Sequence, residues 1–87
     1  MPHFHLNLYN AHGDLPDPEG ADYATLDDAR RAAIDGIRSL LGAEVIEGEM
    51  NLEGHLDIVT DDGRVVESIP FTDALKIVGD VAAVARD

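Results

Sequence analysis

The chain has 87 residues, with 18 Asp or Glu against 6 Lys or Arg, so its formal net charge is −12. This length suits one small domain, and an apolar share of 45 % is typical of a folded chain. The charge disfavours direct binding to nucleic-acid backbones, because carboxylates repel phosphates. The absence of Cys excludes a disulfide scaffold and a zinc ribbon.

The composition shows no sign of membrane insertion or export. No apolar run approaches the ~20 residues of a membrane span, and the start Met1-Pro2-His3-Phe4 lacks the segments of a signal peptide. We therefore expect a cytoplasmic protein that makes no contact with a membrane. We expect one domain over residues 1–79, followed by a tail of small residues over 80–87.

Alternating apolar and polar residues predict a first strand over residues 3–9. Phe4, Leu6 and Leu8 share one face of this strand. The segment 10–24 contains two Pro and two Gly, so we expect a long irregular loop there.

A helix with one apolar face is predicted over residues 26–41. Thr25 suits the N-cap, because its hydroxyl can accept from a backbone N–H in the first turn. The helix ends at either Gly42 or Gly48, and the pattern favours a frayed continuation to about Glu47.

A β-hairpin is predicted around a two-residue turn at Asp62-Gly63. With this turn, Asp61 lies opposite Arg64 and Leu56 lies opposite Ile69. The face toward the helix then holds the apolar residues Leu56, Ile58, Val65, Ile69 and Phe71.

Three charged residues interrupt these apolar faces. Arg30 and Glu44 fall within the apolar arc of the helix, and Glu67 lies opposite Ile58 on the inner face of the hairpin. The long stem of Arg30 can reach solvent, and a position at the sheet edge would relieve Glu67. Pro70 lacks a backbone N–H, which predicts that the last strand lies at an edge or ends there.

The order of these elements predicts an α+β fold. One amphipathic helix packs on a small, mainly antiparallel β-α-β-β sheet, and a short helical turn or tail follows.

Four segments stand in a recognisable order along the chain. They are Met1-Pro2-x-Phe4-x-Leu6-x-Leu8, Pro16-Asp17-x-Glu19-Gly20, Leu26-Asp27-x-Ala29-Arg30, and Asp61-Asp62-Gly63-Arg64 continuing to Ile69-Pro70-Phe71. Together they resemble a domain-of-unknown-function family of short alphaproteobacterial proteins. The resemblance spans about residues 1–78 and implies a small cytoplasmic bacterial α+β protein without an established activity. It supplies no catalytic residues.

A second resemblance rests on Asp17-x-Glu19-Gly20 and Thr25-Leu26-x-x-Ala29, which are similar to segments of HicB-like antitoxins. It implies three strands before the helix, and a toxin as the partner with its gene adjacent on the chromosome.

His3 and His5 lie two residues apart on the first strand, so their side chains project from the same face, about 6–7 Å apart. This spacing can hold a metal ion if His12 or His55 supplies a third ligand. The alternative is a solvated strand face that carries two polar residues. We expect no metal or other cofactor, and keep the four histidines as candidate ligands.

We expect no enzymatic activity. Without Cys, the candidate nucleophiles are serines and threonines, and Ser68 lies near His55 and Asp57 only on an open sheet face. Such a face provides neither a cleft nor an oxyanion hole.

The sequence favours a non-enzymatic protein-binding or regulatory module, with self-association as one form of it. The outer sheet face and the loop 10–24 are the candidate contact surfaces, and the charge favours a basic partner. The candidate contact residues are His5, Asn7, Tyr9, Val59, Val66, Asp17 and Glu19. An acidic mimic of nucleic acid is an alternative, and it requires carboxylates spaced like phosphates on one face.

Overall fold

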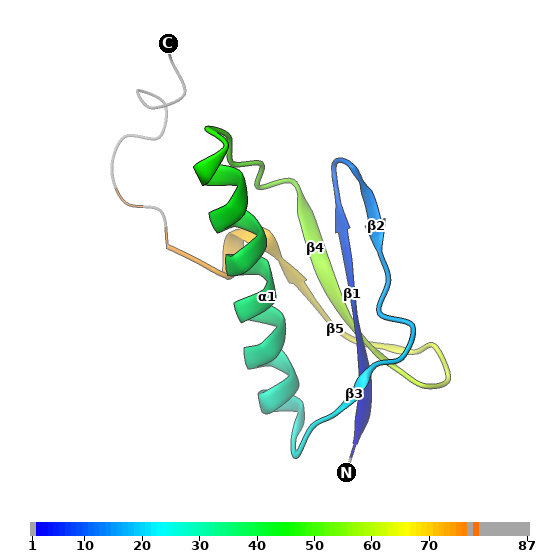
Figure 1. Cartoon of the computed structure of the whole chain (residues 1–87). Coiled ribbons are helices and arrows are strands. Elements are labelled where there is room, and N and C mark those ends of the chain that lie inside the picture. The colour runs from blue at the N-terminus through cyan, green and yellow to red at the C-terminus, as the bar shows by residue number, and fades with distance from the viewer. Residues whose placement is uncertain (1, 77, 79–87) are drawn as a thin grey trace.

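The computed structural model describes residues 2–76 and 78, and shows one helix lying on one face of a five-stranded antiparallel sheet (Figure 1). The strand order is β2-β1-β4-β5, and β3 also pairs with β1. The elements are β1 (His3–Asn10), β2 (Gly13–Leu15), β3 (Ala21–Asp22), α1 (Leu26–Ile46), β4 (Gly54–Thr60), β5 (Val65–Pro70) and the 3₁₀ helix η1 (Phe71–Asp73). The predicted α+β fold is confirmed. The predicted tail over 80–87 lies outside the described residues.

The helix begins and ends close to where the sequence predicted. Thr25 Oγ1 accepts from the backbone N–H of Asp28 at 3.1 Å, which confirms the N-cap. The helix continues past Leu41 and Gly42 to Ile46. Within the described part of the chain, no helix is both long enough and apolar enough to cross a membrane.

The core lies between α1 and the inner face of the sheet. The helix contributes four buried residues at helical spacing, and the sheet and η1 contribute the remainder. The largest fully buried side chains are those of Phe71, Ile37, Leu41 and Ile58.

The hairpin register is confirmed over most of its length. Leu56 pairs with Ile69 and Ile58 pairs with Glu67, and β5 lies at an edge of the sheet, as Pro70 predicted.

The turn of the hairpin differs from the prediction. Thr60 donates its backbone N–H to the Arg64 carbonyl at 2.9 Å, so the loop has three residues and Asp61 does not pair with Arg64. Gly63 adopts a φ of 87°, which is typical of a three-residue loop that ends in a bulge. The register therefore shifts after Ile58, and Val65 is 52 % exposed instead of facing the helix.

The loop 10–24 also differs, because it contains the short strands β2 and β3. Both pair with β1, on the edge opposite β4. β2 has three residues and β3 has two, and backbone pairing with the edge of β1 stabilises them in the absence of an apolar pattern.

The charged residues that interrupt the apolar pattern have partners in the structure. Arg30 Nε donates to both carboxylate oxygens of Glu67, at 3.0 and 2.8 Å. Glu44 Oε1 accepts from the backbone N–H of Asn51 at 2.9 Å, in the segment that leaves the helix. Two of the three exceptions therefore form one ion pair that ties α1 to the edge strand.

Candidate functional site

Two regions of the surface gather residues that can carry a function. The first is the histidine cluster, formed by His3, His5 and Asp61. The second is the helix-end groove, lined by His12, Leu40, Ala43, Glu44, Glu47 and Glu49.

The histidine cluster joins the start of β1 to the turn after β4. The rings of His3 and His5 lie edge to face, with their centroids 5.4 Å apart. Asp61 Oδ1 lies 2.8 Å from His5 Nε2 and 3.8 Å from His3 Nε2. Among the residues that the structure describes, this is the one group of three His, Asp or Glu whose ligand atoms lie within 4.8 Å of one another.

The remaining ring nitrogens contact oxygen atoms of the loop 16–22. His3 Nδ1 lies 2.7 Å from Asp22 Oδ1, and His5 Nδ1 lies 2.7 Å from the carbonyl of Asp17. His3 Nε2 also lies 2.8 Å from the Glu19 carbonyl. All four ring nitrogens therefore have oxygen acceptors in reach, a setting that suits the doubly protonated imidazolium.

These hydrogen bonds change the acidity of both rings. The pKa of His3 is raised above its ordinary value of 6.5, first by the Asp22 carboxylate and then by the Glu19 carbonyl. The pKa of His5 is raised as well, first by the Asp17 carbonyl and then by Asp61.

Asp17 fixes the loop against β1. One carboxylate oxygen accepts from the backbone N–H of Leu6 at 3.1 Å, and the other accepts from Gly20 N–H at 3.2 Å. Its own N–H donates to Asn7 Oδ1 at 2.8 Å. The carboxylate thus supplies an acceptor for the edge of β1 in the gap between β2 and β3.

The loop approaches β1 too closely for any residue but glycine at position 20. Gly20 has a φ of 67°, and a Cβ built there would lie 2.7 Å from the Phe4 carbonyl and 2.8 Å from His3 Nε2. The loop is therefore seated against the two histidines and the backbone between them.

The other two predicted metal ligands lie elsewhere. β4 runs antiparallel to β1, so His55 pairs with Tyr9 at the far end of β1, where the two rings stack at 4.9 Å. His12 belongs to the helix-end groove. The third member of the cluster is instead Asp61. Its proximity follows from the pairing of Phe4 with Thr60, which the sequence does not reveal until the strand order is known.

The outer sheet face is less open than the predicted contact surface requires. Val59 is buried at 9 % exposure, and it shares a shallow hollow with Pro16 and Pro18 of the docked loop. The Asn7 side chain accepts a hydrogen bond from the backbone N–H of Asp17. Val66, in contrast, is exposed. Glu19 offers its carbonyl to His3. Val59 therefore does not form part of an accessible apolar patch.

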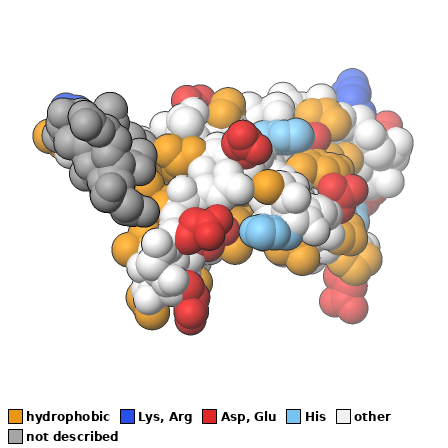
Figure 2. All heavy atoms as spheres, turned by 90° about the horizontal axis from the view of Figure 1, so that it is seen from above, with side chains coloured by type: hydrophobic (Ala, Val, Ile, Leu, Met, Phe, Trp, Pro, Cys, Tyr) orange, Lys and Arg blue, Asp and Glu red, His pale blue; other side chains and the backbone are white. Residues whose placement is uncertain are grey.

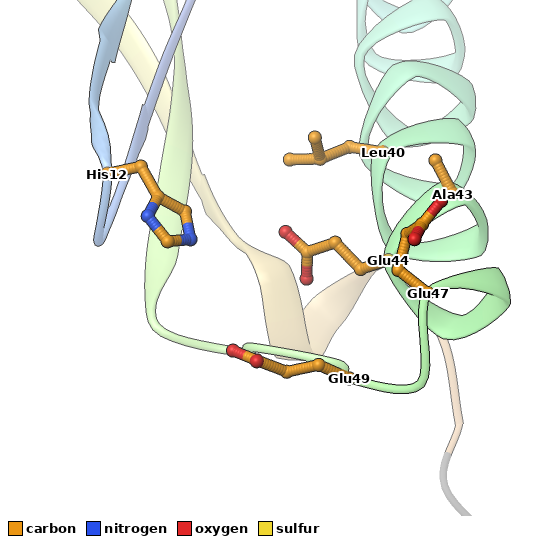
Figure 3. Close-up of a pocket in the computed structure, with 6 residues that line it drawn as sticks. All are labelled: His12, Leu40, Ala43, Glu44, Glu47 and Glu49. Carbon is orange, nitrogen blue, oxygen red and sulfur yellow. The ribbon is translucent and has the colours of Figure 1, made fainter.

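The helix-end groove is a hollow of about 320 Å³ between the C-terminal half of α1 and the β1–β2 turn. Figure 3 shows Leu40 and Glu44 pointing from the helix toward the turn that carries His12, with Glu49 on the segment below them. A neighbouring hollow shares Glu49 and is lined by Val45, Gly48 and Met50. Val45 is 55 % exposed and Ile46 is 84 % exposed, so apolar surface continues around the end of the helix.

This end of the helix carries negative charge where a helix favours positive charge. The last turn of α1 has no basic residue, although Glu44 and Glu47 lie at its end. Within the described residues, no ion pair involves these glutamates or Glu49. Figure 2 looks down on this end of the molecule and shows red carboxylates among orange apolar side chains, with blue basic side chains at the margins of the view.

The sequence did not identify the helix-end groove. A signal was present in the spacing of Glu44, Glu47 and Glu49 around the end of the helix, close to the apolar run at Val45 and Ile46. That run continues the helix with both side chains largely exposed.

The comparisons with known proteins agree with the first resemblance seen in the sequence. A family model described as a domain of unknown function (DUF6894) matches residues 3–72. No curated protein and no protein of solved structure shows a detectable match to the chain.

Proposed function

The chain belongs to DUF6894, a family of domains of unknown function, and we propose that it is a non-enzymatic module that binds a basic segment of a partner protein. The helix-end groove is the proposed binding surface. The observation that carries the proposal is the apolar surface at the end of α1, surrounded by glutamates that lack a basic counterpart in the last turn.

The chemistry of the groove defines the partner. Leu40 and Ala43 in the groove, and Val45 in the neighbouring hollow, offer apolar surface, which favours an aliphatic side chain on the partner. Glu47 and Glu49 favour Lys or Arg on either side of it, because opposite charges steer encounter and offset the negative end of the helix. The partner segment is therefore amphipathic and basic.

Self-association is a weaker form of the same proposal. Two copies each carry a net charge of −12, so an acidic surface on one repels the same surface on the other. A partner of opposite charge fits the groove better than a second copy.

The other readings of the sequence find less support. Carboxylates lie at both ends of α1, in the loop before it and in the β4–β5 turn, which does not favour a nucleic-acid mimic with its charges on one face. Three strands do precede the helix, as the resemblance to antitoxins implied. A toxin with a basic segment would be one special case of the proposed partner.

Fluorescence anisotropy with a labelled synthetic peptide that repeats Leu-Leu-Arg-Lys tests the proposal on the full chain. We expect Glu47→Gln/Glu49→Gln to weaken binding about fivefold, which corresponds to about 1 kcal/mol. Val45→Ser should weaken it as well, because the neighbouring hollow, which shares Glu49 with the groove, loses apolar contact.

The matched control is Asp35→Asn/Asp73→Asn, which removes the same charge at exposed sites away from the groove. It should bind like the original chain. If both charge variants lose the same affinity, the peptide is attracted by net charge alone and the groove is not the binding surface. Light scattering gives a second test. If the chain forms a dimer that excludes the peptide, and this dimer persists in Glu47→Gln/Glu49→Gln, the proposal is contradicted.

A further inference from the structure

The histidine cluster has the composition of a metal site, and it lies apart from the helix-end groove. We propose that His3, His5 and Asp61 bind one divalent transition-metal ion of the Zn²⁺ type. The proposal does not depend on the groove, so each can fail while the other stands.

The distances within the cluster suit one ion. Ligand atoms that surround a tetrahedral Zn²⁺ at about 2.0–2.1 Å lie about 3.3–3.4 Å from one another. Asp61 Oδ1 is now 2.8 Å from His5 Nε2 and 3.8 Å from His3 Nε2, which brackets that separation. Asp61 is an exposed residue in a three-residue turn, so a small shift of its side chain is enough to equalise the two distances.

The second nitrogen of each ring is already held by an acceptor. Histidine ligands usually donate their other N–H to a carboxylate or a carbonyl, which fixes the ring and its tautomer. His3 Nδ1 faces the Asp22 carboxylate at 2.7 Å, and His5 Nδ1 faces the Asp17 carbonyl at 2.7 Å. The two Nε2 atoms are then the ligand atoms. Both lie next to Asp61, and His3 Nε2 also lies 2.8 Å from the Glu19 carbonyl.

Binding exchanges protons for the ion. His5 Nε2 loses the proton through which it now donates a hydrogen bond to Asp61. His3 Nε2 loses the proton through which it donates to the Glu19 carbonyl. Metal affinity should therefore rise with pH, as it does whenever imidazoles must lose protons to become ligands.

The ligand set also selects the class of ion. Two imidazoles and one carboxylate suit Zn²⁺, Ni²⁺ and Cu²⁺ better than Mg²⁺ or Ca²⁺, which prefer oxygen ligands alone. Three protein ligands leave a fourth position to water. An ion here would connect residues 56 positions apart in the chain, and so fasten β1 to the β4–β5 turn.

Isothermal titration of the full, untagged, chelator-treated chain with ZnCl₂ tests the proposal. We expect one ion per chain and an increase in melting temperature, because the ion binds the folded state in preference to the unfolded one. Asp61→Asn, His5→Gln and His3→Gln should each lower the affinity at least tenfold. Asp22→Asn, which changes only the partner of His3 Nδ1, should lower it about tenfold or more.

Two matched controls separate the site from general attraction to histidine or negative charge. Asp62→Asn changes the next carboxylate in the same turn, and His12→Ala/His55→Ala removes the two histidines outside the cluster. Both controls should bind Zn²⁺ like the original chain.

Folding of each variant is checked by circular dichroism. If the histidine variants unfold, the metal affinity of the Asp61→Asn chain alone tests the proposal. With Co²⁺, a folded Asp61→Asn chain should lose the visible absorption of a low-coordinate site. Absence of binding at millimolar Zn²⁺ would overturn the proposal. Equal losses in Asp61→Asn and Asp62→Asn, or in the cluster and control histidines, would overturn it as well.

Discussion

The loop 16–22 and the end of α1 are both acidic, but their carboxylates have different surroundings. In the loop, Asp17 and Asp22 accept hydrogen bonds from backbone amides and histidines of the same chain. At the end of α1, Glu47 and Glu49 lie beside exposed apolar side chains, and the last helical turn has no basic residue. Carboxylates thus hold the fold together in one region and leave an open surface in the other.

The largest expected difference between the two regions is at glycine. Gly20 and Gly48 both have positive φ, but a Cβ would meet three atoms within 3.0 Å at Gly20 and nothing within 4 Å at Gly48. We expect Gly20→Ala to lower the free energy of unfolding by about 2–4 kcal/mol, from strain and overlap together. Gly48→Ala should cost only about 1–2 kcal/mol, from backbone strain alone.

Urea denaturation of the two variants measures this difference. Equal losses would show that the loop is not seated against His3 and the Phe4 carbonyl as the structure has it.

The next largest effect concerns the carboxylates themselves. Asp17→Ala removes an acceptor from two backbone amides and should lower the free energy of unfolding by about 1.5–3 kcal/mol. Glu49→Ala removes a carboxylate of the helix-end groove and should change stability by less than about 0.5 kcal/mol. Thermal melts of both variants test the contrast, and a loss in Glu49→Ala as large as that in Asp17→Ala would contradict it.

The next effect is smaller, and its sign differs between the two ends of the helix. Glu47→Gln removes negative charge from the C-terminal end and should stabilise the chain by about 0.3–1 kcal/mol. Asp28→Asn removes negative charge from the N-terminal end and should destabilise it by a similar amount. Denaturation at low salt measures both, and the difference should shrink in high salt. If Glu47→Gln instead destabilises the chain, Glu47 already has a favourable contact.

The smallest effect is the dependence of stability on pH. The folded pKa values of His3 and His5 are raised above 6.5, so the stabilisation that their protonation supplies is complete below that pH. It is lost as the pH rises through the folded pKa values. Melting temperatures measured in EDTA from pH 6 to 9 should show this loss in the original chain. The slope should be absent from His3→Gln/His5→Gln, and an equal slope in both chains would remove the two histidines as its cause.

The elements that were predictable from the sequence are those whose side chains alternate between core and solvent. Thr25 and the apolar spacing of α1 identified the helix. The pairing of Leu56 with Ile69 was predicted from a two-residue turn at Asp62-Gly63, and the register shift after Ile58 preserves it although the turn itself differs. The strands β2 and β3 have no such pattern, because backbone hydrogen bonds to β1 stabilise them. The three-residue turn was missed because Gly63 fits a two-residue turn and a bulged loop equally well.

The candidate sites were predictable only in part, for a related reason. The sequence identified His3 and His5 as two side chains on one strand face, since that requires only the strand period. The third ligand depends on which strand lies beside β1 and in what direction. The antiparallel register brings Asp61 to the cluster and takes His55 to the other end of β1. The polar partners of Arg30 and Glu44 were hidden in the same way, because each lies on another segment of the chain.

The edges of the sheet limit how two copies of this chain can meet. One edge is divided between β2 and β3, with the Asp17 carboxylate occupying the gap between them. The other edge, β5, has a bulge at one end and Pro70 at the other, and Glu67 pairs there with Arg30. Short, interrupted and charged edges resist the strand-to-strand stacking that builds fibrils. The chain should therefore remain dispersed at concentrations where a sheet with long, flat edges would polymerise.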